Sequence, residues 1–179
     1  LLGAVGSGAA WKVAQPTINW LKLSQTAIQT LGLQSTVVTT QIIPAETYTH
    51  FFQILVSINT ILLDFDRDMW DYISRGYFQQ HKEEGQVGSS AMPHKVNPID
   101  FENSEGNIGI ANSLLQHFIE KLPVSRLQRD LSDSTVKRNF GVALGHSLIS
   151  YQSAAAGLKK LSFNTYWLYR GRLQNCVKI

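Results

Sequence analysis

Residues 51–77 read FFQILVSINTILLDFDRDMWDYISRGY, and the spacing of their apolar side chains decides the fold class. These side chains recur mostly at steps of three and four, which places them on one face of a helix. They are Phe51, Ile54, Leu55, Ile58, Ile61, Leu62, Phe65, Met69, Trp70, Ile73 and Tyr77. Pro44 suits the first turn, where no amide donor is needed. Helices in globular domains usually have about 8–20 residues, so a helix of about 35 residues predicts an elongated bundle.

The rest of the chain predicts further helices and few strands. An amphipathic helix is expected around 19–31, a second from Pro98 to a stop before Pro123, and a long third over 132–161. Ser132 or Asp133 is expected to cap the third helix. Residues 33–43 are rich in β-branched side chains and predict an extended connection. The predicted fold is therefore an all-α bundle.

Two expectations concern the surface and the ends of this bundle. The charges on the helix of residues 51–77 are predicted to form a solvated face: Asp64, Asp66, Arg67 and Asp68. Residues 1–161 are predicted to be one partial helical-bundle domain and residues 162–179 a divergent C-terminal tail. The chain starts at Leu1 without an initiator methionine, so we expect it to be an internal piece of a longer protein.

Composition limits the classes of function. The 179 residues are 44% hydrophobic with a net charge of +3, and the basic residues are scattered rather than blocked, so nucleic acid is not an expected partner. No apolar run reaches the roughly 20 residues that span a bilayer, so no membrane partner is expected either. Cys176 has no second cysteine to pair with, which favours a reducing compartment, the cytoplasm. Small anionic ligands remain compatible with this charge.

Residues 88–98 form a segment suited to chemistry on a carboxylate: Gly88-Ser89-Ser90-Ala91-Met92-Pro93-His94-Lys95-Val96-Asn97-Pro98. A serine serves as a general base only in a cationic or amide-rich environment. Lys95 supplies a compact positive charge, and the Asn97 amide can donate to a carboxylate oxygen. Taken singly, such a serine is usually a solvated turn residue and such a lysine a surface residue. The combination is what predicts a dicarboxylate site.

This segment closely resembles the signature loop of the fumarase/aspartase superfamily, specifically that of its adenylosuccinate lyase branch. His94, between the proline and the lysine, is typical of that branch, whereas fumarases have glycine there and argininosuccinate lyases glutamine. The resemblance implies a bundle of long helices completed by tetramerisation, with each active site assembled from three chains. It implies no metal and no cofactor.

The resemblance also implies a role for each loop residue. Ser89 would abstract a Cβ proton from the succinyl group, and Ser90 would contact the substrate. Lys95 and Asn97 would stabilise the aci-carboxylate intermediate. The reaction would be a β-elimination that releases fumarate from adenylosuccinate, or from its imidazole-carboxamide analogue SAICAR. The other substrate-binding residues expected in the loop are Met92 and Val96.

A second segment, residues 126–138, gathers guanidinium groups, hydroxyls and a helix start, which is chemistry suited to phosphate. Alone, it would be more simply explained as a basic helix start with a capping serine. Residues 129–138 resemble the part of adenylosuccinate lyases that contacts the nucleotide monophosphate. The resemblance implies that Arg129, Ser134 and Arg138 bind the AMP moiety. Adjacent residues expected at the substrate are Thr135, Val136 and Lys137.

Two further residues resemble those of the superfamily, and one expected motif is missing. Gln41, after Thr39-Thr40, corresponds to a substrate-binding glutamine, and Glu102 resembles a carboxylate close to the loop. The superfamily's acid histidine lies in a motif that this chain lacks. The histidines present all stand in other contexts: His50, His81, His94, His117 and His146. Ser89 is thus expected to be half of an acid–base pair.

Two alternatives remain open from the sequence. One is another lyase of the superfamily, of the argininosuccinate lyase or fumarase type. The other is a non-catalytic homologue with a structural role, suggested by departures around Trp11 and Ala45 and by the residues after 161. Binding of AMP, as opposed to a simple dicarboxylate, distinguishes adenylosuccinate lyase from the first alternative.

Overall fold

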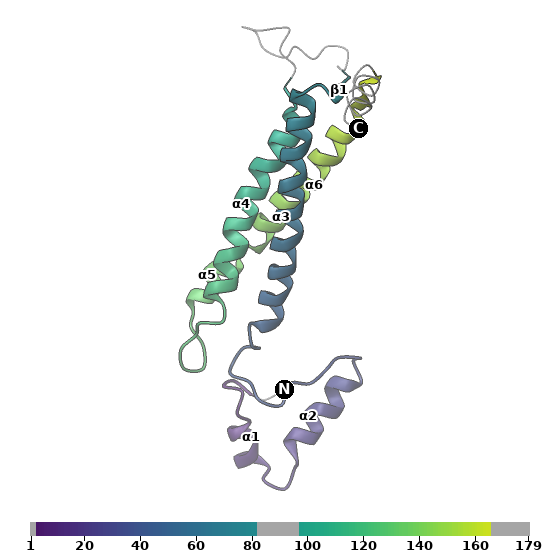
Figure 1. Ribbon diagram of the computed structural model, residues 1–179. Helices are drawn as coiled ribbons and strands as arrows, with labels where there is room; N and C mark the ends of the chain where they lie inside the picture. Colours follow the sequence, from purple (N-terminus) through teal and green to yellow (C-terminus); the bar gives the residue numbers. More distant parts are fainter. Residues whose placement is uncertain (1–2, 82–96, 166–179) are drawn as a thin grey trace, which may run out of the picture. The chain divides into compact units, whose positions relative to one another are not determined.

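The computed structural model describes residues 3–81 and 97–165, and in these residues the protein is helical with one short two-stranded antiparallel sheet (Figure 1). The elements, in chain order, are α1 (Ala9–Ala14), α2 (Trp20–Gln29), α3 (Glu46–Ser74), β1 (Phe78–Gln80), α4 (Ile99–Lys121), α5 (Ser132–Lys137), α6 (Phe140–Lys159) and β2 (Leu161–Phe163). The predicted all-α class is confirmed. The division of domains at residue 161 stays a prediction.

The chain divides into two compact units. The first contains residues 1–53 and 116–139, and the second contains residues 54–115 and 140–179. Helices α3 and α4 each contribute one part to either unit. The candidate phosphate segment lies in the first unit, whereas the residues flanking the signature loop lie in the second, and each is described within its own unit.

The second unit is a bundle of α6 with the adjoining parts of α3 and α4, which run side by side (Figure 1). Its core is made of apolar side chains from α4 and α6 that have almost no exposed surface. They are Phe101, Ile108, Ala111, Leu115, Ala143 and Ala154. Most of these lie at steps of three, four or seven along their helix, as a buried face requires.

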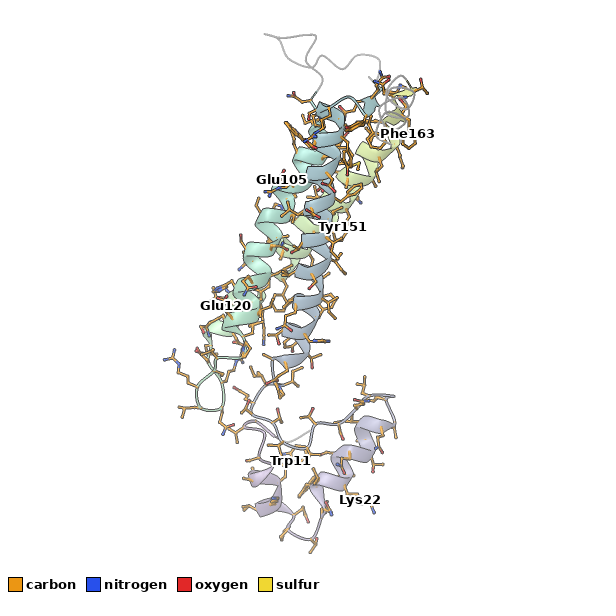
Figure 2. The ribbon with its side chains drawn as sticks, in the orientation of Figure 1. Trp11, Lys22, Glu105, Glu120, Tyr151 and Phe163 are labelled. Atoms are coloured by element: carbon orange, nitrogen blue, oxygen red, sulfur yellow. The ribbon has the colours of Figure 1, made fainter. Side chains whose placement is uncertain are left out.

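A polar cluster crosses the core of this bundle. Asn59 on α3 is fully buried, and its Nδ2 donates to Asn112 Oδ1 at 2.9 Å and to Ser147 Oγ at 3.2 Å. The hydroxyl of Tyr151, on α6, donates to Asn59 Oδ1 at 2.6 Å (Figure 2). Because buried amides are costly without partners, these bonds favour one register of the three helices.

The two-stranded sheet of β1 and β2 was not predicted. The strands are antiparallel, with Phe78 opposite Phe163 and Gln80 opposite Leu161. Each strand has three residues, which is too short for an alternating pattern to be recognised. This sheet pairs the chain after α3 with the chain after α6.

The first unit packs around the ends of α3 and α4. Phe52 and Phe118 are buried, with ring centroids 5.4 Å apart. Gly6 has a φ of 76°, and a Cβ there would stand 2.3 Å from the carbonyl oxygen of Thr40. Glycine is therefore required where residues 3–6 meet the Thr39-Thr40 segment.

Two expectations about helices need correction. The long helix α3 has 29 residues rather than about 35, because Gly76, with φ of 77°, ends it. The predicted helix over 132–161 is two helices, α5 and α6, interrupted at Arg138 and Asn139. The Asn139 side chain donates to the Thr135 carbonyl oxygen at 3.0 Å, a bond typical of helix ends.

The capping prediction was also wrong. Leu131 occupies the N-cap position of α5 and makes no side-chain cap. Asp130 Oδ1 instead accepts from the Ser132 backbone N–H at 3.0 Å. The acceptor, Asp130, thus precedes both predicted caps, Ser132 and Asp133.

The predicted solvated face includes one buried residue. Asp66 is only 1% exposed, whereas Asp64, Arg67 and Asp68 are exposed as expected. Its position follows from helical spacing, because Asp66 stands four residues after Leu62 and three before Met69, both on the apolar face.

Candidate functional site

Most of the signature loop lies outside the described residues. Ser89, Ser90, Met92, Lys95 and Val96 belong to this part, so their assigned roles stay predictions. Asn97 and Pro98 are described and immediately precede α4.

Asn97 and Pro98 accept the first backbone hydrogen bonds at the start of α4. The Asn97 carbonyl oxygen accepts from Ile99 N at 2.8 Å, and the Pro98 carbonyl oxygen accepts from Phe101 N at 3.0 Å. Asp100 and Glu102 occupy the first helical turn, where the helix dipole favours carboxylates. Asn97 itself is exposed, so its side-chain amide is open to solvent.

Glu102, the carboxylate expected near the loop, has a defined partner. Its Oε1 accepts from Trp70 Nε1, on α3, at 3.1 Å. One turn along α4, Glu105 binds Arg67, with an N–O distance of 2.9 Å. These contacts connect α3 to the first turns of α4 within the second unit (Figure 2).

In the first unit, Asp133 organises the candidate phosphate segment. Its Oδ2 lies 2.8 Å from Lys137 Nζ, and its Oδ1 lies 3.7 Å from Arg129 Nη2. Arg129 Nη2 also donates to Ser134 Oγ at 3.0 Å. The hydrogen bond from Lys137 lowers the pKa of Asp133, so this carboxylate is charged at neutral pH. From the sequence, Asp133 is predicted only as a possible helix cap. It stands four residues after Arg129 and four before Lys137, and this spacing is the sequence pattern that indicates contacts with both.

Asp130 forms ion pairs with basic side chains that precede α5. Its carboxylate lies 3.5 Å from Arg126 Nε and 3.6 Å from Lys121 Nζ. The pKa of Asp130 is lowered to about 2, mainly by the hydrogen bond from the Ser132 backbone N–H; the Ser132 hydroxyl lies nearby and contributes, although it forms no hydrogen bond of normal geometry. Asp130 and Asp133 therefore neutralise much of the basic charge that the sequence shows in this segment.

Several polar groups in this segment nevertheless have unused bonding capacity. Arg129 Nε and Ser132 Oγ are buried without a hydrogen-bond partner among the described residues. Arg138 is exposed and forms no ion pair with the part of the chain that the structure describes. Buried donors without partners are uncommon, and they favour a site that a bound polar molecule completes.

The remaining predicted contacts in this segment differ in exposure. Thr135 is exposed and can meet a ligand, whereas Val136 is buried, with 9% of its surface exposed. Lys137 is half-buried, and its ammonium also lies 5.5 Å from the ring centroid of Tyr48.

Gln41 is brought next to the same segment. Its backbone N–H donates to the carbonyl oxygen of Gln128 at 3.2 Å, adjacent to Arg129. The preceding threonines turn the chain, because the Thr39 and Thr40 hydroxyls both donate to the Ile42 carbonyl oxygen. The structure therefore juxtaposes Gln41 and the start of the phosphate segment, which are far apart in sequence.

A small cavity lies between these two segments. Its volume is about 100 Å³, and its polar lining includes Thr40, Asp130, Asp133 and Lys137. Nucleotide-sized ligands need several times this volume. The cavity by itself is therefore a place for a few water molecules beside the segment.

Two other kinds of feature are absent from residues 3–81 and 97–165. There, no cluster of three or more His, Cys, Asp or Glu side chains has the arrangement of a metal site. Nor is any helix in those ranges long and apolar enough to cross a bilayer.

Comparison with known proteins gives the class. Residues 1–111 match a family model described as lyase, and residues 125–178 match one described as adenylosuccinate lyase C-terminal. The chain belongs to this lyase family, in its adenylosuccinate lyase branch.

Its curated relatives carry the particular name. The chain is 52% identical over 173 residues to the adenylosuccinate lyase of Haemophilus influenzae, covering 97% of this chain and 38% of that protein. It is 52% identical to the Escherichia coli K12 adenylosuccinate lyase over 90% of this chain and 36% of that protein. The Legionella pneumophila Corby adenylosuccinate lyase is 51% identical over 97% of the chain and 38% of its own length. The chain thus spans less than two fifths of the length of these relatives.

Proposed function

We propose that the protein carrying this chain is an adenylosuccinate lyase, which cleaves adenylosuccinate to AMP and fumarate and acts likewise on SAICAR in purine biosynthesis. The observation that carries the proposal is the 52% identity to proteins of that name over nearly the whole chain. The loop residues Ser89, Lys95 and Asn97 supply the chemistry that this reaction needs.

In the proposed mechanism, Ser89 is the general base. It removes the proton from the succinyl Cβ, and the electron pair moves into the adjacent carboxylate to form the aci-carboxylate. The Lys95 ammonium and the Asn97 amide stabilise this charge as it develops. The C–N bond then breaks, and the nitrogen leaves with a proton from an acid that residues outside this chain supply.

The nucleotide part is proposed to bind at residues 129–138. The Arg138 guanidinium and the unused Arg129 Nε are suited to phosphate oxygens, and the Ser132 and Ser134 hydroxyls lie in the same short segment. Gln41 supplies an amide next to Gln128. Thr135, Val136 and Lys137 are proposed to complete the contact.

The proposal extends to assembly and location. We propose a homotetramer whose active sites combine residues from three chains, working in the cytoplasm without metal or cofactor. The support is the membership of the lyase family together with exposed apolar side chains on α3 and α6. Because each site would be composite, this chain alone is expected to be inactive.

The Ser89→Ala variant tests the base. Loss of a general base slows catalysis by about 10²–10⁴-fold, so fumarate release by the protein carrying this chain should fall by that factor. Ser113→Ala is the matched control, since the Ser113 hydroxyl is exposed on α4 and bonds only its own helix, at the Gly109 carbonyl. Unchanged fumarate release in Ser89→Ala contradicts the assigned role. An inactive parent protein favours a non-catalytic homologue.

Arg138→Gln tests the nucleotide site. We expect AMP to bind at least about tenfold more weakly, because a charge-assisted hydrogen bond contributes roughly 1.5–3 kcal/mol. Arg75→Gln is the control, since Arg75 is exposed and paired with Asp71. Binding of fumarate without any binding of AMP by the parent protein would instead support a different lyase of the superfamily.

A further inference from the structure

Lys160, directly after α6, contacts both sides of the segment that carries Ser89. Its backbone carbonyl oxygen accepts from His81 N at 2.8 Å, immediately before residues 82–96. Its side-chain Nζ lies 2.9 Å from Asp100 Oδ2, in the first turn after them. One residue therefore joins the two described ends of this segment, within a single unit of the structure.

Neighbouring contacts fix Lys160 in place. Its own N–H donates to the Gly157 carbonyl oxygen at 3.1 Å, which ends α6, and the pairing of β1 with β2 starts at the next residue. Gly157 lies against the Phe101 ring so closely that a Cβ would stand 2.8 Å from Cζ. The peptide and side chain of Lys160 therefore extend from a rigid helix end.

The ion pair is sheltered compared with its neighbours. The side chains of Lys160 and Asp100 are 20% and 19% exposed. By contrast, those of Arg67 and Glu105 are 67% and 39% exposed, and the Arg75 pair is similarly open. Screening by water is weaker for the sheltered pair, so it restrains geometry more than a surface pair does.

We propose that Lys160 is a positioning residue for the elimination, because it holds together the two ends of the segment that bears Ser89. The proposal rests on the function proposed above. Lys160 touches no reacting atom; it acts through Asp100 and His81, which bracket the loop. Loss of its ammonium leaves the Asp100 carboxylate without its partner and frees one of the two ends.

The test compares Lys160→Met with Lys159→Met in the protein carrying this chain. Methionine keeps the backbone carbonyl and much of the aliphatic length but removes the charge. Lys159 is exposed, one residue earlier on α6, so its variant makes the same change in charge without touching Asp100. The first readout is amide hydrogen exchange in peptides covering residues 78–81 and 98–103. We expect faster exchange of residues 98–103 in Lys160→Met only, and unchanged exchange of residues 78–81, because methionine keeps the carbonyl oxygen that accepts from His81 N–H.

The second readout separates positioning from general damage. A misplacement of about 1 Å can cost about a hundredfold in rate, so kcat for fumarate release should fall between about tenfold and a hundredfold. AMP affinity should stay within twofold of the parent, because the proposed nucleotide site lies in the other unit. The exchange variant Asp100→Lys/Lys160→Asp should recover part of both the exchange protection and kcat.

The outcomes are decisive in either direction. Equal exchange and equal kcat in the two methionine variants overturn the proposal. So does a loss of AMP affinity in proportion to kcat, since that shows general unfolding. If the parent protein releases no fumarate, the lyase proposal fails, and the exchange comparison alone then decides whether Lys160 holds the two ends.

Discussion

At the scale of single residues, Asp66 is a carboxylate whose ionisation is strongly changed by folding. It is 1% exposed, and neither carboxylate oxygen has a hydrogen-bond partner among the described residues. Burial raises the pKa of Asp66 from 3.8 to about 6, and Glu105 adds a smaller repulsion. The nearby Ser104 hydroxyl opposes this increase and lowers the pKa by more than Glu105 raises it, but it forms no hydrogen bond of normal geometry.

This pKa predicts how stability depends on pH. Between about pH 4 and 6 the folded protein binds a proton that the unfolded chain has released, so stability falls as pH rises through this window. The full penalty, at most about 3 kcal/mol, is present above pH 6. Asp66→Asn removes the ionisation and should raise the free energy of unfolding at pH 7.5 by about 1–2 kcal/mol, with little gain at pH 4.5. Urea unfolding at both pH values measures it.

Asp68→Asn is the matched control, because Asp68 is exposed on the same helix. It should show no such difference between the two pH values. The lowered pKa values of Asp130 and Asp133 act in a lower window, below about pH 4, where their protonation removes stability. An equal gain from Asp66→Asn at pH 4.5 and 7.5 would contradict the burial argument.

The sequence identified residue types better than residue environments. The serine, lysine and arginine candidates came from recognisable motifs, whereas Asp66 and Asp133 depend on which helix face is covered. Asp66 was grouped with charged neighbours although its spacing from Leu62 and Met69 places it on the apolar face. Asp66 is charged and yet buried, so its position on the apolar face of the helix predicts its burial better than its charge does.

At the scale of secondary-structure elements, two of the glycines of α6, Gly145 and Gly157, have contrasting surroundings. A Cβ on Gly157 would stand 2.8 and 2.9 Å from two atoms of the Phe101 ring, whereas a Cβ on Gly145 would meet nothing within 4 Å. Gly157→Ala should destabilise the protein by about 1–3 kcal/mol through overpacking. Gly145→Ala should stabilise it by about 0.5–1 kcal/mol through helix propensity.

Urea unfolding of both variants measures this contrast, and each serves as the control for the other. Both variants add one methyl group to the same helix, so any effect that the two substitutions share cancels when their unfolding midpoints are compared. Equal changes in the midpoint would show that Phe101 does not pack against α6 as described.

Helix positions were largely predictable, but helix ends were not. The apolar periodicity of residues 51–77 and the prolines at 98 and 123 located α3 and α4 to within a few residues. The break between α5 and α6, at Arg138 and Asn139, contains no proline or glycine, and there the Asn139 side chain bonds to the Thr135 carbonyl oxygen. Local hydrogen bonds of this kind compete with the helix without changing the apolar pattern.

At the scale of the whole molecule, the helices leave a large apolar surface uncovered. In the second unit, a groove of about 470 Å³ lies between α3 and α6. Its lining is almost entirely apolar: Ile58, Ile61, Leu62, Phe65, Tyr151, Ala154, Ala155 and Leu158. Ile61 is 72% exposed and Leu158 48%. An apolar surface of this kind favours association.

We therefore expect the chain to self-associate, with second copies covering this groove. Sedimentation velocity should show species heavier than the 20.0 kDa monomer at micromolar concentration. Ile61→Glu should shift the distribution toward the monomer, because burying an unpaired carboxylate in an apolar contact is costly. Val13→Glu is the control, since Val13 is 85% exposed on α1, outside the groove. A folded wild-type monomer, with helical circular dichroism and a single slow boundary, would show that this surface is compatible with water and needs no second copy.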